Sequence, residues 1–215
     1  MSGPRLRWTP DMEAASREAA DAVTALARRR GLVDVAYSVM DTPLGGLLVA
    51  TTRQGLVRLE FPDVRLDDIL EDLAEAISPR VLEDPRGTER VRREIDAYFE
   101  GRIHRLRTPV DWSLTPPGFS RRVLEATAAI PFGSVSTYAH VARLAGSPRA
   151  ARAAGNALHD NPIPIVVPCH RVVPSGGGIG KYGGQEWRKA FLLDLEGALE
   201  EGAPASRPRR DRMQR

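Results

Sequence analysis

The sequence predicts an α+β fold in two domains, and three patterns along the chain indicate it. Short runs of β-branched and apolar residues, separated by glycine and proline turns, fill residues 35–61. Apolar residues at helical spacing follow, interrupted by one proline-rich stretch that is typical of a linker. Strands grouped before helices favour an α+β arrangement over alternating βα units. We expect domains at 34–112 and 113–200, a helical extension at 1–33, and a disordered, arginine-rich tail at 201–215.

The extension is expected to form one helix that begins at the capping signal Thr9-Pro10-Asp11 and ends near Arg30. Its apolar face is rich in alanine and therefore weak. Docking onto the rest of the chain, a contact between copies and partial disorder all stay open for this helix.

The first domain is expected to contain a meandering antiparallel sheet and two helices. In chain order these are strands at Val35–Met40, Leu47–Thr52 and Leu56–Phe61, then helices at Leu66–Ile77 and Gly87–Phe99. No residue here has catalytic spacing. His104 is interpreted as an ordinary surface histidine, and the acidic residues of the first helix as its solvated face.

The second domain is expected to be helical after a linker at 105–117. Its helices are predicted at Gly118–Ala129, Ser136–Ala145, Ser147–His159 and Gln185–Glu196, with N-cap signals at Ser136-Thr137 and Ser147-Pro148. The short glycine-containing break between the second and third helices is typical of a helix-turn-helix. The last helix is expected to place Trp187, Ala190, Phe191 and Leu195 on or near its apolar face.

Composition narrows the possible functions. The 215 residues include one cysteine and four histidines, which exclude an internal disulfide and match no metal-site spacing, so we expect a reducing, cytoplasmic location. No apolar run has the length of a signal peptide or a membrane span, and no membrane partner is expected. Residues 34–111 carry 16 carboxylates against 11 arginines, whereas residues 113–197 carry 9 lysines and arginines against 5 carboxylates. The basic second half favours a polyanion such as nucleic acid, although the surplus is modest.

The only cysteine, Cys169, follows an apolar run at 163–167 that is bracketed by prolines and interpreted as a buried extended segment. Only a thiolate is a strong nucleophile, and the neighbouring His170 and Arg171 offer a base and a cation that could produce one. A small buried hydrophobic residue is the alternative interpretation of a lone cysteine. A glycine-rich loop at 175–184 follows, which is suited to close approach of a ligand.

The stretch Pro168-Cys169-His170-Arg171-Val172, with Asn161-Pro162 upstream and Tyr182-Gly183-Gly184 downstream, resembles the methylated-DNA–protein-cysteine methyltransferase family (O6-alkylguanine-DNA alkyltransferases). The likeness runs from about Pro131 to Gly197 and extends more loosely back to Val35. It implies a ribonuclease-H-like sheet domain with a mainly structural role. It also implies a winged helix-turn-helix-like second domain that carries the active-site cysteine.

The resemblance implies a role for each catalytic residue. Cys169 would accept the alkyl group, His170 would act as its general base through a water, and Glu196 would orient His170. Tyr138 would donate from its phenol toward the departing base and lie where the turn binds phosphate, Asn161 would hold the turn around the nucleophile, and Lys189 falls at the family's active-site lysine. Arg171 is expected to make structural hydrogen bonds.

The helix expected at 147–159 presents alanine and glycine where a major-groove reader would present amides and charges. Small residues favour sequence-independent contact with the minor groove of duplex DNA, although a helix packed tightly on its neighbours is the alternative. The resemblance implies that Arg152 fills the space left by an everted guanine. The expected DNA contacts are Ala151, Arg152, Ala153, Gly155 and Tyr138, and the expected base pocket is formed by Pro164, Val172, Tyr182 and Gly183. Gly183 departs from the family, which often has a serine there that bonds the alkylated oxygen.

The implied activity is direct reversal of DNA damage. The protein would transfer an alkyl group from either O6-alkylguanine or O4-alkylthymine to Cys169, in a single turnover and without a cofactor. It would act as a monomer. Two alternatives stay open: a non-catalytic lesion sensor or DNA-binding regulator, and a Cys-His hydrolase or thiol redox enzyme. The presence of Cys169 weighs against the sensor, and the lack of a second cysteine weighs against the redox enzyme.

Overall fold

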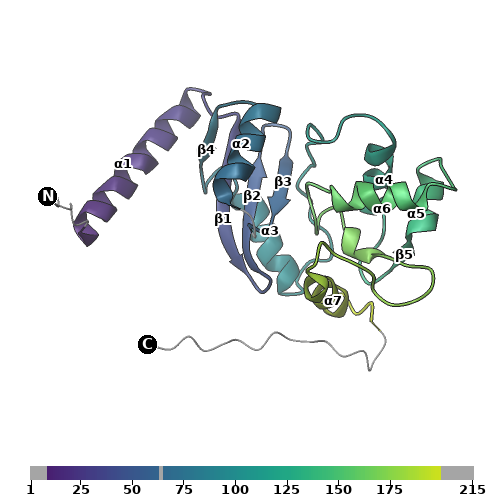
Figure 1. Cartoon of the computed structure of the whole chain (residues 1–215). Coiled ribbons are helices and arrows are strands. Elements are labelled where there is room, and N and C mark those ends of the chain that lie inside the picture. Colours follow the sequence, from purple (N-terminus) through teal and green to yellow (C-terminus); the bar gives the residue numbers. More distant parts are fainter. Residues whose placement is uncertain (1–8, 63–64, 200–215) are drawn as a thin grey trace, which may run out of the picture.

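The structure is a computed structural model that describes residues 9–62 and 65–199 (Figure 1). Helix α1 (Pro10–Arg29) lies at one end, the sheet domain in the middle and the helical domain at the other end. This agrees with the α+β class expected from the sequence. The tail expected at 201–215 lies outside the described residues. Within the described ranges, no helix combines the length and the apolar character needed to cross a membrane.

The sheet domain is built on four strands in the order β3-β2-β1-β4. β1 (Val35–Thr42), β2 (Gly45–Thr51) and β3 (Leu56–Glu60) form the expected antiparallel meander. The expectation of a purely antiparallel sheet was wrong, because β4 (Val81–Glu83) pairs with β1 in parallel. Three residues are too few to show a strand's alternating pattern, so no pattern in the sequence indicated β4.

The two faces of the sheet are covered by different partners. Leu48 and Ala50 of β2 pack with helix α2 (Leu66–Ala76), whereas Leu47 and Val49 point to the opposite face. That second face joins helix α3 (Glu89–Phe99) and the helical domain in one apolar cluster. The central strand is therefore buried on both sides, which explains its nearly continuous apolar sequence.

Helix α1 begins as expected, since Thr9 Oγ1 accepts the Met12 amide and Pro10 fills the first turn. Near its C-terminal end Arg28 pairs with Asp84 at 3.1 Å. The apolar side chains of Met12, Val23 and Leu26 are exposed, so this helix buries little.

The helical domain contains α4 (Phe119–Ala128), β5 (Ser136–Thr137), α5 (Tyr138–Leu144), α6 (Ala151–His159), the 3₁₀ helix η1 (Cys169–Arg171), β6 (Val172–Val173) and α7 (Glu186–Leu195). β5 and β6 pair in parallel and bring the start of α5 beside the end of η1. Thr137 caps α5 through its Oγ1, which accepts the His140 amide, so that N-cap signal is confirmed.

The N-cap predicted at Ser147-Pro148 was wrong, because α6 begins only at Ala151. The Ala150 amide donates to the Ser147 carbonyl, which makes residues 147–150 a turn. Serine at the first position and proline at the second are favoured in a β-turn as well as at a helix start. The helix-turn-helix therefore has a longer connection than the sequence suggested.

The two domains are joined along the edge strand β3. The Leu59 amide donates to the Pro162 carbonyl at 2.9 Å, beside the cysteine-bearing segment. Farther along β3, Leu56 exchanges backbone hydrogen bonds with the linker at Pro109 and Asp111. Arg188 of α7 lies over the Phe61 ring, 4.2 Å from its centroid. These contacts cover the β3 edge and hold the helical domain against the sheet.

Candidate active site

The segment before the cysteine is a turn, so the expected extended conformation of residues 163–167 was wrong. The Val167 amide donates to the Ile163 carbonyl at 2.9 Å, and Ile165 has a φ of 71°. A β-branched residue in this left-handed region is strained by about 1–2 kcal/mol. The expected burial is confirmed, because Ile163, Ile165 and Val167 are all buried. Tertiary burial of these side chains offsets the backbone strain.

Asn161 closes this turn from both sides. Its Nδ2 donates to the Val167 carbonyl at 2.8 Å, and its Oδ1 accepts the Ile163 amide at 3.1 Å. Pro162, Pro164 and Pro168 have no amide hydrogen to donate, so a side chain must supply part of the bonding of this segment. Asn161 therefore fixes the point at which the chain enters η1.

Cys169 is the first residue of η1 and lines a cavity of about 900 Å³ between the two domains. It is half-buried, and its Sγ lies 3.9 Å from Tyr182 Oη. Tyr138 and Gly155, from α5 and α6, line the same cavity. The thiol is therefore accessible to a ligand rather than sealed in the core.

His170, the second residue of η1, is fully buried. Its Nε2 lies 3.0 Å from Glu196 Oε1, whereas its Nδ1 has no hydrogen-bond partner among the described residues. Burial lowers the pKa of His170 below its usual 6.5, although Glu196 acts in the opposite direction. The imidazole is therefore neutral at neutral pH, with Nε2–H donating to Glu196 and Nδ1 free to accept a proton.

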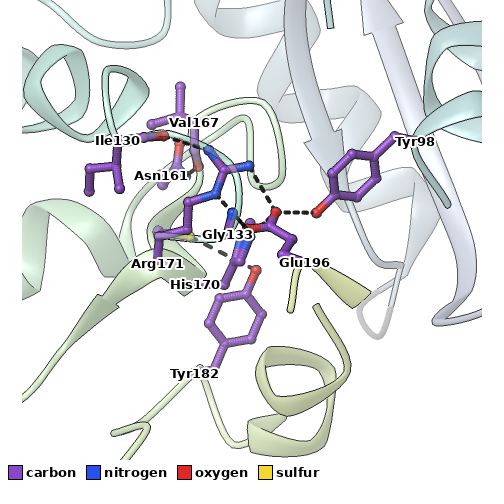
Figure 2. Close-up of polar contacts among 10 residues, drawn as sticks. Tyr98, Ile130, Gly133, Asn161, Val167, His170, Arg171, Tyr182 and Glu196 are labelled. Atoms are coloured by element: carbon purple, nitrogen blue, oxygen red, sulfur yellow. Dashed lines mark hydrogen bonds and ion pairs between the residues drawn. The ribbon is translucent and has the colours of Figure 1, made fainter. Parts of the chain in front are cut away.

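Glu196, the C-cap residue of α7, is the centre of a buried hydrogen-bond network (Figure 2). Arg171 donates to both of its carboxylate oxygens at 2.8 Å, and Tyr98 Oη donates to Oε1 at 2.6 Å. Burial opposes ionisation of Glu196, but the hydrogen bonds from His170 and Arg171 outweigh it and lower its pKa to about 2. Arg171 also donates to the Ile130 carbonyl at 2.6 Å, which agrees with the structural role expected for it.

Tyr98 is the residue of this network that sequence reasoning missed. It lies in α3 of the sheet domain and follows Val91 and Ile95 at helical spacing, so the sequence marks it only as part of an apolar face. Burial and the nearby Glu196 carboxylate raise the pKa of Tyr98, which keeps its phenol protonated as a donor. Only its position in the folded molecule relates it to the cysteine motif.

The cation that lowers the pKa of the Cys169 thiol is Lys189, not the adjacent Arg171 that the sequence suggested. Burial raises the pKa of the Cys169 thiol, and Asn161, Tyr182 and Lys189 offset part of that rise. Lys189 is fully buried, donates to the Val172 carbonyl at 2.7 Å, and has its pKa lowered by burial to about 8. The resting thiol is therefore protonated, and a base must remove its proton when it reacts.

The buried face of α7 is wider than expected, although Trp187, Phe191 and Leu195 do pack against the apolar core as expected. Arg188, Lys189, Leu192 and Leu193 are buried, whereas the four residues expected on the apolar face are only half-buried. Both cations have partners in the structure, since Arg188 bonds the Leu44 carbonyl as well as stacking on Phe61. Charged residues with such partners do not appear as core in a hydropathy pattern.

Among the expected base-pocket residues, Pro164, Tyr182 and Gly183 line the cavity. Val172 is not among the lining residues, because it is fully buried and its carbonyl is taken by Lys189. Gly183 has a φ of 59°, and a side chain added there would meet no atom within 4 Å. This position leaves the cavity open where the family often has a serine.

Helix α6 divides its small residues between two faces. Ala154, Ala157 and Leu158 are buried against the domain, while Arg152 and Ala153 are exposed. Arg152 has no ion pair or hydrogen bond to any residue that the structure describes. Ala151 and Gly155 are half-buried, and a Cβ on Gly155 would lie 3.8 Å from the Tyr138 ring. The packed helix and the exposed small surface are thus properties of opposite faces.

A helix-turn-helix domain that presents a cysteine, with a buried histidine and carboxylate behind it, defines a class of DNA-binding proteins with a cysteine nucleophile. The family model described as 6-O-methylguanine DNA methyltransferase, DNA binding domain, matches residues 118–198. The model for the ribonuclease-like domain of the same methyltransferase matches residues 35–112. The chain belongs to the methylated-DNA–protein-cysteine methyltransferase family, as the motif around Cys169 indicated.

Individual relatives support this assignment. The methylated-DNA–protein-cysteine methyltransferase of Rattus norvegicus is 35% identical over 184 residues, which cover 80% of this chain and 86% of the rat protein. The Mycobacterium tuberculosis protein of the same name is 35% identical over 160 residues, covering 74% and 91% of the two chains. The crystal structure of Mycobacterium tuberculosis OGT in complex with DNA matches with a TM-score of 0.65 and 32% identity, over 76% of this chain and 93% of that one.

Proposed function

We propose that this protein repairs O6-alkylguanine, and O4-alkylthymine, in duplex DNA by moving the alkyl group to Cys169 in a single turnover. The observation that carries the proposal is the combination of an accessible thiol with a buried histidine and carboxylate. Cys169 lines an open cavity, and the neutral His170 behind it holds an unpartnered Nδ1 and a bond to the ionised Glu196. This is the set of groups needed to activate a protonated thiol.

In the proposed reaction, a water passes the Cys169 proton to His170 Nδ1. The sulfur then attacks the alkyl carbon, so that an S–C bond forms while the C–O6 bond breaks and its electron pair stays on guanine. Tyr138 donates from its phenol to the ring as negative charge develops, and the proton lost by the thiol is returned through solvent to the departing base. The product thioether is stable, so each molecule acts once.

We also propose that the target nucleotide is everted into the cavity while α6 lies in the minor groove. The exposed Arg152 and Ala153, with the half-buried Ala151 and Gly155, support this proposal, because small side chains allow close approach and the arginine is free to enter the stack. Alanine and glycine make up most of that face, so contact would be largely independent of sequence. The protein would act as a monomer on DNA in the cytoplasm.

The central test is a single-turnover assay with duplex DNA that contains one O6-methylguanine. The mass of the Cys169 peptide should rise by one methyl group and stop at one equivalent, and Cys169→Ala should show no gain. Lesion binding by the wild type without any mass gain would instead support a non-catalytic sensor. Repeated turnover of small esters or disulfides, without an effect of DNA, would support a hydrolase or redox enzyme.

The role of α6 is tested separately with Arg152→Ala. We expect slower transfer from duplex DNA and an unchanged rate with a free O6-alkylguanine base, because only the duplex requires eversion. Arg149→Ala, an exposed neighbour at the helix start, is the matched control for general phosphate attraction. An equal loss with both substrates would contradict the eversion role of Arg152.

A further inference from the structure

Tyr98 links the sheet domain to the proposed reaction centre. Its Oη lies 2.6 Å from Glu196 Oε1, although 98 residues separate the two in sequence, and the tyrosine is 1% exposed (Figure 2). We infer that Tyr98 is a positioning residue for alkyl transfer: its hydrogen bond shares the charge of Glu196, which limits how strongly this carboxylate favours the imidazolium, and it holds the carboxylate that orients His170. This inference rests on the proposed function of Cys169 and assigns a part in it to the sheet domain.

Tyr98 is one of four residues that donate hydrogen bonds to the carboxylate of Glu196. Oε1 is shared by His170 Nε2, Arg171 Nη2 and Tyr98 Oη, and Oε2 is shared by Arg171 Nε and the Gly133 amide. Of these donors, Tyr98 alone comes from the sheet domain. It bonds the same oxygen as the histidine, so its loss changes the charge on that oxygen directly.

The electrostatic consequence has a definite sign. A carboxylate that is bonded by more donors attracts a further proton less strongly. The other charges that act on His170 are Arg171 beside it and Lys189 on α7, both of which favour the neutral imidazole. Without Tyr98 Oη, the uncompensated charge on Glu196 Oε1 would stabilise the imidazolium. A larger share of His170 would then be protonated and unable to accept the thiol proton.

Packing alone does not require the hydroxyl. The Tyr98 ring makes edge contacts with Phe99 and Phe132, with centroids 5.5 Å and 6.1 Å away. A phenylalanine ring would keep both contacts, so Tyr98→Phe removes the hydrogen bond while it preserves the apolar cluster. Ser38→Ala is a matched control, because Ser38 Oγ makes a buried 2.6 Å hydrogen bond to Thr88 Oγ1 in the same domain, away from the cavity.

The experiment measures the single-turnover rate of methyl transfer against pH for the wild type, Tyr98→Phe and Ser38→Ala. In Tyr98→Phe we expect the low-pH side of the rate profile to move to higher pH. A rise of about one unit in the pKa of the histidine would lower the rate on that side by about tenfold, because a smaller share of the imidazole could accept the thiol proton. Ser38→Ala should lose stability without any movement of the low-pH side. An unchanged low-pH side in Tyr98→Phe would overturn the inference and leave the residue a packing group.

A second measurement follows the His170 imidazole directly by NMR titration, since the chain has only four histidines to assign. We expect the pKa of His170 to be higher in Tyr98→Phe than in the wild type, and equal values would overturn the inference. The readouts separate the two hypotheses. A wild type that transfers no methyl group defeats the proposed function, whereas a competent wild type with identical titrations in both proteins defeats only the role of Tyr98.

Discussion

Replacing Glu196 by glutamine tests how much the buried network contributes to stability. Its side chain is fully buried and accepts five hydrogen bonds from four residues: Tyr98, Gly133, His170 and Arg171. Glutamine keeps the shape but removes the charge, and it turns an NH₂ group toward donors that need an acceptor. The Arg171 guanidinium would be left buried beside a neutral group, which is a costly arrangement.

The magnitude follows from the pKa of Glu196, which is lowered from 4.5 to about 2. One pKa unit corresponds to about 1.4 kcal/mol, so the folded state favours the ionised carboxyl by about 3 kcal/mol. Because the folded pKa is the lower one, this stabilisation is fully present above pH 4.5 and is lost as the pH falls toward about 2. Glu196→Gln should therefore lower the free energy of unfolding by about 3 kcal/mol at neutral pH and by about half of that near pH 3.

Urea unfolding followed by tryptophan fluorescence at several pH values measures this difference, since the chain contains three tryptophans. Asp194→Asn is a suitable control, because Asp194 lies on the exposed side of α7 close to Glu196 in sequence. Asp194→Asn should change the free energy of unfolding by less than about 0.5 kcal/mol, as most surface substitutions do. A loss for Glu196→Gln that does not shrink as the pH falls would refute the electrostatic account, and so would a loss no larger than that of the control.

Three further predictions concern the cavity and the charge beside the thiol. Lys189→Met should slow methyl transfer at neutral pH by about tenfold, since loss of this nearby cation would raise the pKa of the Cys169 thiol further. The pH dependence of Cys169 alkylation by iodoacetamide checks the cause, and an unchanged thiol pKa would contradict it. Gly155→Ala should raise the free energy of unfolding by about 0.5–1 kcal/mol, because it removes a glycine from the interior of a helix and the new methyl group would lie 3.8 Å from Tyr138, at an ordinary contact distance. Thermal unfolding measures the gain. A lower melting temperature would show that the site is tighter than that distance implies. Gly183→Ser should lower the free energy of unfolding by about 1–2 kcal/mol, because its φ of 59° disfavours a side chain. The same change should slow the transfer of benzyl groups more than that of methyl groups. Equal slowing of both would show that Gly183 does not determine the space available for the alkyl group.

Local patterns in the sequence predicted most of the helices and strands, but not the path of the chain before Cys169. The caps at Thr9 and Thr137 act within one helical turn, so sequence alone was enough to find them. The β-branched residues of the run before Cys169 favour an extended conformation, yet hydrogen bonds of Asn161 to both ends of the run bend it into a turn. A propensity describes single residues, and it is overridden where a side chain closes a loop around them.

Long-range contacts explain how residues far apart in the sequence meet at the site. Lys189 of α7 lowers the pKa of the Cys169 thiol and Tyr98 of α3 donates to Glu196, and no motif relates either helix to the other. The resemblance located Lys189 by its position, because it falls inside the continuous match. Tyr98 lies in the sheet domain, where only a structural role was expected, and its periodicity is that of an ordinary core residue.

The placement of the charged network at the domain boundary has a physical reason. An ion pair is strong only where water is excluded, and Glu196 and Arg171 are buried between α3 of one domain and η1 and α7 of the other. One apolar cluster runs through both domains around this network, and the backbone bond from Leu59 to Pro162 joins β3 to the turn before Cys169. The sheet domain therefore supplies part of the low-polarity surroundings that hold His170 neutral. Loosening the domain contact would admit water to the network and weaken the bonds that orient the histidine, even with every residue of the cysteine motif intact.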